Sequence, residues 1–113
     1  MATRTGGDAV VEALVELGVE RVFGIVSVHN LPIADAILRN GRITWHPVRH
    51  EQGAVHAADG CARATGCLGV AVVSTGPGTA NAMGGLFEAA YASSRVLLIS
   101  ASYLSLSKSN TWF

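Results

Sequence analysis

The sequence has few charged, aromatic or cysteine residues, and each scarcity argues against a class of protein. Only 14% of the 113 residues are charged, and eight basic residues balance eight acidic ones. A nucleic-acid-binding surface needs an excess of basic charge, so we expect no nucleic-acid partner. Half of the residues are hydrophobic. That fraction excludes a disordered chain and is sufficient for a folded core in one domain.

The two cysteines and the hydrophobic runs indicate where the protein works. Cys61 and Cys67 lack the paired Cys and His spacing of a zinc site, so we expect reduced thiols and a cytoplasmic protein. No apolar run approaches the roughly 18 residues of a membrane-spanning helix. The polar segment from Met1 to Asp8 also lacks the apolar core of a signal peptide. We therefore expect no membrane partner.

Helical and strand-like patterns alternate along the chain. The predicted helices cover residues 9–17, 31–38, 51–65 and 80–92, and the predicted strands cover residues 19–28, 43–48, 68–74 and 95–100. Apolar strands that alternate with amphipathic or small-residue helices are typical of a parallel sheet covered on both faces. The sequence therefore predicts a three-layer α/β/α fold whose parallel sheet has about four strands.

A carboxylate stands where one predicted strand gives way to a helix. Glu51 follows the strand 43–48, which we expect to be central in the sheet, and opens the helix 51–65. Ligands of open α/β sheets bind at the carboxyl ends of the strands, and the first turn of a helix favours an ionised carboxylate. The alternative is an ordinary glutamate that complements the helix dipole.

A glycine-rich loop, Thr75 to Thr79, follows the third predicted strand. Gly76 and Gly78 could let backbone N–H groups approach a phosphate. The Rossmann fingerprint fails, however, because Asn81 occupies the position of its third glycine and the loop does not follow the first strand. A tight strand-to-helix turn is the alternative.

Serine and histidine residues raise a further alternative, a hydrolase. Ser27 or Ser74 would have to meet His29 or His50 in the folded chain. The sequence contains no G-x-S-x-G elbow, and nothing in it pairs a serine with a histidine and an acid. This activity is the least favoured of the functions considered.

Five segments occur in the order and spacing of one known family. They are 22–25 (VFGI), 29–33 (HNLPI), 49–54 (RHEQGA), 57–66 (AADGCARATG) and 74–81 (STGPGTAN). Together they resemble the N-terminal pyrimidine-binding domain of thiamine-diphosphate-dependent enzymes, of the acetolactate synthase, benzoylformate decarboxylase and pyruvate oxidase type. The resemblance covers Thr5 to Ala101.

The resemblance implies a cofactor, a reaction class and a set of site residues. In that family a glutamate at the position of Glu51 hydrogen-bonds N1′ of the aminopyrimidine of thiamine diphosphate, and the cofactor serves lyases and decarboxylases of 2-keto acids. Burial in an apolar cleft should raise the pKa of this carboxyl. The segment Thr75, Gly76, Pro77 and Gly78, together with Asn81, would flank the pyrimidine end.

The resemblance also implies that this chain holds only part of a site. Family members carry a separate domain in which a Gly-Asp-Gly and Asn motif binds the diphosphate through a divalent metal such as Mg²⁺, and this sequence has no such motif. We therefore expect an incomplete pyrimidine-binding domain in residues 1–101 and an unrelated tail in residues 102–113. Catalysis would need a diphosphate-binding partner domain.

Truncation of the domain would leave one sheet edge open. The expected edge is the apolar segment Val96 to Ile99, and an open apolar edge pairs with something or aggregates. We expect the tail to fold over this edge or two chains to join there, which predicts a homo-oligomer, a dimer or higher. The alternative to a cofactor half-site is a self-associating, non-catalytic remnant or repurposed domain.

Overall fold

The computed structural model describes residues 3–101, and its helices and strands alternate as the sequence predicts. The elements in chain order are α1 (Gly6–Glu16), β1 (Arg21–Gly24), the 3-10 helix η1 (Val28–Asn30), α2 (Leu31–Asn40), β2 (Thr44–Pro47), α3 (Glu51–Thr65), β3 (Gly69–Val73), α4 (Pro77–Tyr91) and β4 (Val96–Ser100). None of these helices is long and apolar enough to cross a membrane.

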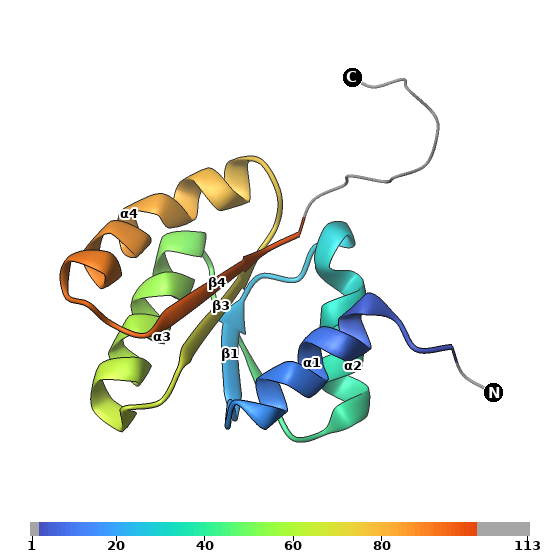
Figure 1. Cartoon of the computed structure of the whole chain (residues 1–113). Helices are drawn as coiled ribbons and strands as arrows, with labels where there is room; N and C mark the ends of the chain where they lie inside the picture. Colours follow the sequence, from blue (N-terminus) through green and yellow to red (C-terminus); the bar gives the residue numbers. More distant parts are fainter. Residues whose placement is uncertain (1–2, 102–113) are drawn as a thin grey trace.

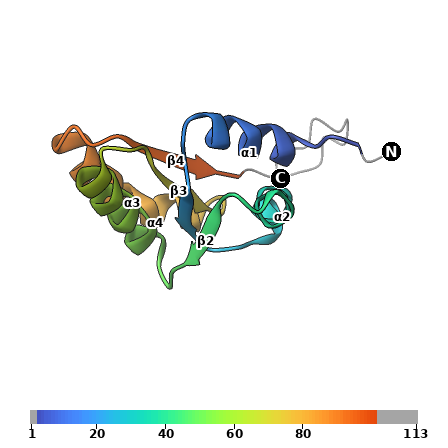
Figure 2. The ribbon, with the colours of Figure 1, turned by 90° about the horizontal axis from the view of Figure 1, so that it is seen from below.

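The four strands form one parallel sheet in the order β2-β1-β3-β4. Helices α1 and α2 cover one face of the sheet, and α3 and α4 cover the other (Figures 1 and 2). The predicted three-layer α/β/α architecture is therefore confirmed. The chain runs from β1 outward to β2, crosses back through α3 to β3, and then continues to β4 on the other side.

The core consists of two apolar clusters, one on each face of the sheet. Val22, Val70 and Val72 pack with α1 and α2, whereas Ala71 and Val73 pack with α3 and α4. Successive strand residues point to opposite faces, so β3 contributes to both clusters and is buried throughout. This explains why β3 reads in the sequence as a continuous apolar run.

The helix that carries Glu51 is fixed at its far end by a polar cluster. Asp59 is 5% exposed, and its two carboxylate oxygens accept hydrogen bonds from Nε and Nη2 of Arg63 at 2.9 and 2.7 Å. The same guanidinium donates to the Ser94 hydroxyl at 3.1 Å and to Glu88 at 3.3 Å. These bonds tie α3 to α4 and to the turn before β4.

The two edge strands of the described sheet are β2 and β4, and only β4 was expected at an edge. The strand before Glu51 was expected to be central, and this is wrong: β2 lies at one edge of the sheet. β4 forms the opposite edge of the described sheet, where Leu97 is 38% exposed. The expected cover for this edge, residues 102–113, lies outside the described residues, and the domain boundary at residue 101 stays a prediction.

Candidate functional site

The candidate site lies where α3 and α4 begin, at the carboxyl edge of the sheet. His50 caps α3 in an extended conformation, and its Nδ1 accepts the backbone N–H of Gln52 at 3.1 Å. Glu51 is the next residue and is half-buried. Because the cap uses His50 Nδ1, that nitrogen serves the helix terminus and does not activate a serine.

The Glu51 carboxylate meets α4 through two residues. Asn81 Nδ2 donates to Glu51 Oε2 at 3.1 Å, across 30 positions of sequence. Gly78 is buried, and a Cβ atom placed there would lie 3.4 Å from Glu51 Oε1 and 3.2 Å from the Cβ of Ser74. The missing side chain at Gly78 therefore lets Glu51 and Ser74 pack closely against the start of α4.

The pKa of Glu51 is lowered, and the expectation of a raised pKa is wrong for this chain. The largest cause is a hydrogen bond from the backbone N–H of Glu51 itself, followed by the Asn81 amide. Burial raises the pKa, but by less, because Glu51 is only half-buried and faces donors as well as apolar groups. The carboxylate is therefore ionised at neutral pH and ready to accept a hydrogen bond.

The glycine-rich segment is a tight turn followed at once by a helix. Gly76 adopts φ 58° and ψ −118°, a conformation that a side chain would strain, and α4 begins at Pro77, earlier than the predicted residue 80. The Gly78 N–H donates to the Thr75 carbonyl at 3.2 Å, and Pro77 has no N–H. This pattern favours the tight-turn interpretation over a phosphate cradle.

The loops after β1 and β3 lie at the point of the sheet where the strand order reverses, because the chain leaves these neighbouring strands in opposite directions. Asn30 organises the loop after β1: it is fully buried, donates from Nδ2 to the Ile25 carbonyl at 2.9 Å, and accepts the Ser27 N–H at 2.8 Å. No role was predicted for Asn30 from the sequence. Its position could have indicated one, because it is a polar residue two positions before Pro32, where a helix begins.

The end of β3 is joined to the start of α4 by Thr79. Its hydroxyl donates to the Ser74 carbonyl at 2.9 Å and is also hydrogen-bonded to the Ser100 hydroxyl at the end of β4. These contacts hold the first turn of α4 against the sheet, and with it Gly78 and Asn81. Within residues 3–101, no group of three or more His, Cys, Asp or Glu side chains lies close enough together to hold a metal ion.

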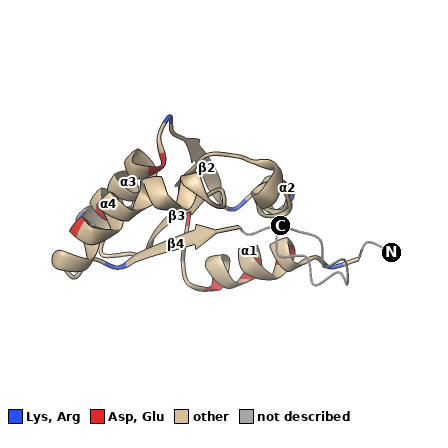
Figure 3. Cartoon of the chain, turned by 90° about the horizontal axis from the view of Figure 1, so that it is seen from above, with Lys and Arg blue, Asp and Glu red and all other residues tan. Residues whose placement is uncertain are grey.

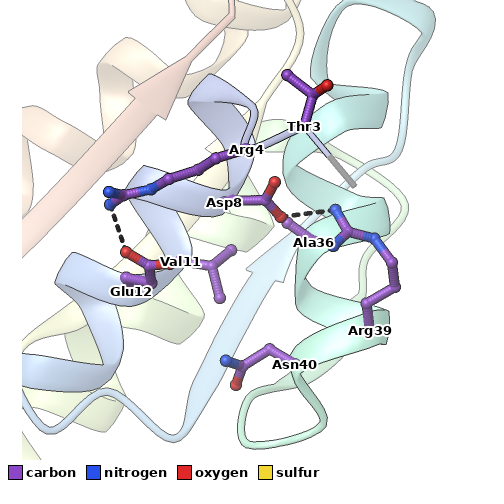
Figure 4. Close-up of a pocket in the computed structure, with 8 residues that line it drawn as sticks. All are labelled: Thr3, Arg4, Asp8, Val11, Glu12, Ala36, Arg39 and Asn40. Carbon is purple, nitrogen blue, oxygen red and sulfur yellow. Dashed lines mark hydrogen bonds and ion pairs between the residues drawn. The ribbon is translucent and has the colours of Figure 1, made fainter. Parts of the chain in front are cut away.

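A hollow of about 370 Å³ lies between α1 and α2 (Figure 4). Arg39 bonds Asp8 at 2.7 Å, and Arg4 is paired with Glu12. The backbone N–H of Thr5, followed by the Arg39 guanidinium, lowers the pKa of Asp8 to about 2. The hollow belongs to the helical layer across the sheet from Glu51, and its charges pair with one another.

Charged residues are spread over both helical layers and do not form a single stripe in the described part of the chain (Figure 3). This distribution agrees with the balance of charge in the sequence. The described part of the chain therefore offers no long-range field of one sign at the candidate site.

Residues 4–110 match the family described as thiamine pyrophosphate enzyme, N-terminal TPP binding domain, and the chain belongs to this family. It is 47% identical over 98 residues to an acetolactate synthase of Arthrospira platensis, covering 84% of this chain and 17% of the relative. It is also 47% identical over 89 residues to the acetolactate synthase isozyme 3 large subunit of Escherichia coli K12, covering 79% of this chain and 16% of the relative.

An acetolactate synthase large subunit of Lactococcus lactis is 44% identical over 95 residues, covering 84% of this chain and 16% of the relative. The chain thus spans less than a fifth of the length of these curated relatives. Membership of the family implies the use of thiamine diphosphate, and over the matched residues the chain is similar to acetolactate synthases.

Proposed function

We propose that the start of α3 and α4 binds the aminopyrimidine end of thiamine diphosphate, with Glu51 as the catalytic residue. The observation that carries this proposal is the ionised Glu51 carboxylate, held by Asn81 and packed against Gly78. The family to which the chain belongs is described by its binding of this cofactor. The residues present fit an aminopyrimidine, because the half-buried carboxylate can accept a hydrogen bond from a ring nitrogen.

The residues of the chain would divide the work at this site. Glu51 would accept a hydrogen bond from a ring nitrogen and hold or return a proton at its carboxylate. The backbone of Thr75, Gly76 and Pro77, with Gly78, would pack beside the ring. Bound thiamine diphosphate would supply an electron sink for reactions of 2-keto acids, as in lyases and decarboxylases.

The lowered pKa of Glu51 has a consequence for this role. A carboxylate that stays ionised in the free chain accepts a hydrogen bond well but takes up a proton reluctantly. A partner surface that covers Glu51 with apolar groups would raise the pKa of its carboxyl and ease proton exchange. We therefore propose that an assembled site, with a partner covering this edge, is the form that performs the reaction.

The partner would also supply the diphosphate and metal contacts, including Mg²⁺. The proposal is supported by the family match, because residues 4–110 correspond to the N-terminal TPP binding domain of these enzymes. A diphosphate-binding domain would fill this role, because this sequence has no Gly-Asp-Gly and Asn motif of its own. The free thiols of Cys61 and Cys67 suit a reducing, cytoplasmic setting.

Calorimetric titration tests the half-site directly. The chain is titrated with thiamine, which carries the pyrimidine but no diphosphate, and separately with thiamine diphosphate and Mg²⁺. We expect weak binding of both, because much of the cofactor's binding energy comes from contacts that this site does not make. Glu51→Gln should abolish the binding, since an amide does not replace the charge of the carboxylate.

Glu20→Gln is the matched control. It makes the same chemical change just before β1, at the amino-terminal end of the strands, and should bind thiamine as the wild type does. No heat of binding at millimolar thiamine diphosphate would contradict the half-site. That result would favour the second candidate, a self-associating and non-catalytic domain that uses the exposed apolar edge at β4.

A further inference from the structure

We propose that Asn81 is a positioning residue that holds the Glu51 carboxylate in its productive orientation, and that it does not primarily contact the cofactor. The bond from Asn81 Nδ2 to Glu51 Oε2 is 3.1 Å long and joins the N-terminal parts of α3 and α4. Its consequence for catalysis rests on the proposed function above. Its effect on the carboxylate does not depend on any ligand.

The geometry assigns each oxygen of the carboxylate to a different part of α4. Oε2 accepts the Asn81 amide, whereas Oε1 lies on the side of Gly78. Gly78 and Asn81 stand three positions apart, so they occupy neighbouring places on one helix face. The amide therefore fixes the rotation of the carboxylate and turns Oε1 toward Gly78.

An anchor of this kind is needed because a glutamate side chain has three freely rotating bonds. A half-buried Glu51 without a partner would sample several rotamers, and few of them would direct an oxygen to one ligand atom. The anchor is itself fixed, because Thr79 bonds the Ser74 carbonyl and thereby holds the first turn of α4 on the sheet.

The surroundings of the carboxylate are simple enough for the contribution of Asn81 to be isolated. From α3, the titratable neighbour that acts on Glu51 is His50, and the backbone N–H of Glu51 also donates. From α4, the contact is the uncharged amide of Asn81. Removal of that amide changes one donor and leaves the helix terminus and His50 in place.

The test is a titration of the Glu51 side-chain carboxyl by carbon-detected NMR in the full chain without ligand. Glu51→Gln identifies the signal among the eight acidic residues. The variants are Asn81→Ala, which removes the donor, and Asn81→Asp, which keeps the volume but replaces the donor with a like charge. Gln52→Ala is the matched control, because Gln52 packs beside Gly84 at the same helix pair and bonds His56.

We expect the Glu51 pKa to rise in Asn81→Ala, to rise further in Asn81→Asp, and to stay near the wild-type value in Gln52→Ala. A purely structural role predicts a different order, in which Asn81→Asp resembles the wild type and Asn81→Ala is disturbed. An unchanged Glu51 pKa in both Asn81 variants, with unchanged thermal unfolding, would overturn the proposal. Circular dichroism of each variant establishes that the fold persists.

Thiamine binding separates this proposal from the proposed function. If the wild type binds thiamine, Asn81→Ala should weaken binding together with the rise in the Glu51 pKa. Weakened binding without a pKa change would mean that Asn81 contacts the ligand itself, which overturns the positioning role. If the wild type binds no thiamine, the half-site fails, while the titration still decides whether Asn81 controls the carboxylate.

Discussion

Alanine substitution of two neighbouring glycines, Gly84 and Gly85, should change the stability of the chain in opposite directions and so test how closely α3 and α4 pack. A Cβ atom at Gly85 would lie 2.7 Å from the Cβ and 2.9 Å from the Cγ1 of Val55, which is fully buried on α3. Favourable carbon contacts need about 3.5–4.0 Å. A Cβ atom at Gly84 would lie 3.5 Å from the nearest atom, the amide nitrogen of Gln52, which is ordinary contact.

The expected changes in unfolding free energy follow from the surroundings of the two glycines. Overpacking costs about 1–3 kcal/mol, and we take the upper end for Gly85→Ala because the Val55 Cβ is fixed to the backbone and has no rotamer that moves it away. The gain in helix propensity from glycine to alanine is about 1 kcal/mol. Gly85→Ala should therefore destabilise the chain by roughly 2 kcal/mol, and Gly84→Ala should stabilise it by roughly 1 kcal/mol.

The assay is urea unfolding followed by circular dichroism, with equal slopes required before the midpoints are compared. Separation of the helices in Gly85→Ala should also lengthen the bond between Asn81 and Glu51 and raise the Glu51 pKa. Equal stability of the two variants would refute the packing argument. A Gly85→Ala variant more stable than the wild type would show that α3 and α4 have room to separate without cost.

Three other changes test the helical layer formed by α1 and α2. Asp8→Asn should flatten the pH dependence of the urea midpoint between about pH 4 and pH 2. Folding lowers the pKa of Asp8 from 3.8 to about 2, so the ionised carboxylate stabilises the folded chain above about pH 4. This stability is lost as the pH falls through the folded-state pKa. An unchanged slope would contradict this. Thr5→Ala should cost about 1 kcal/mol in thermal unfolding, since Thr5 caps α1, and a loss below the error of measurement would exclude the cap. Ile37→Ala should cost about 2–5 kcal/mol of unfolding free energy, because Ile37 is 3% exposed, and a smaller loss would mean that α2 collapses onto the cavity.

Local patterns in the sequence predicted most of the secondary structure. The predicted helix 51–65 has the bounds of α3, and the buried run 68–74 contains β3. The start of α4 was placed too late, at residue 80 and not at Pro77, because two glycines near a proline read as a loop. Proline is nevertheless well suited to the first helical turn, and Gly76 supplies the positive φ that the turn needs.

Two expectations about Glu51 depended on tertiary structure and were wrong. The strand before it is an edge strand, because the chain passes from β2 back across β1 before it adds β3. The pKa of Glu51 is lowered and not raised, because hydrogen-bond donors outweigh the burial that this chain provides. Neither strand order nor the balance between burial and donors has a local signature in the sequence.

The sequence by itself determined the alternation of helices and strands, the family, and the position of Glu51 at the start of a helix. Each of these depends on local periodicity or on residue order, which the sequence states directly. Only the tertiary structure decided that the Asn81 amide meets the Glu51 carboxylate and that Gly78 lets this carboxylate approach α4 closely. These contacts join residues on two helices, and their lengths depend on how closely α3 and α4 pack at Gly85 and Val55.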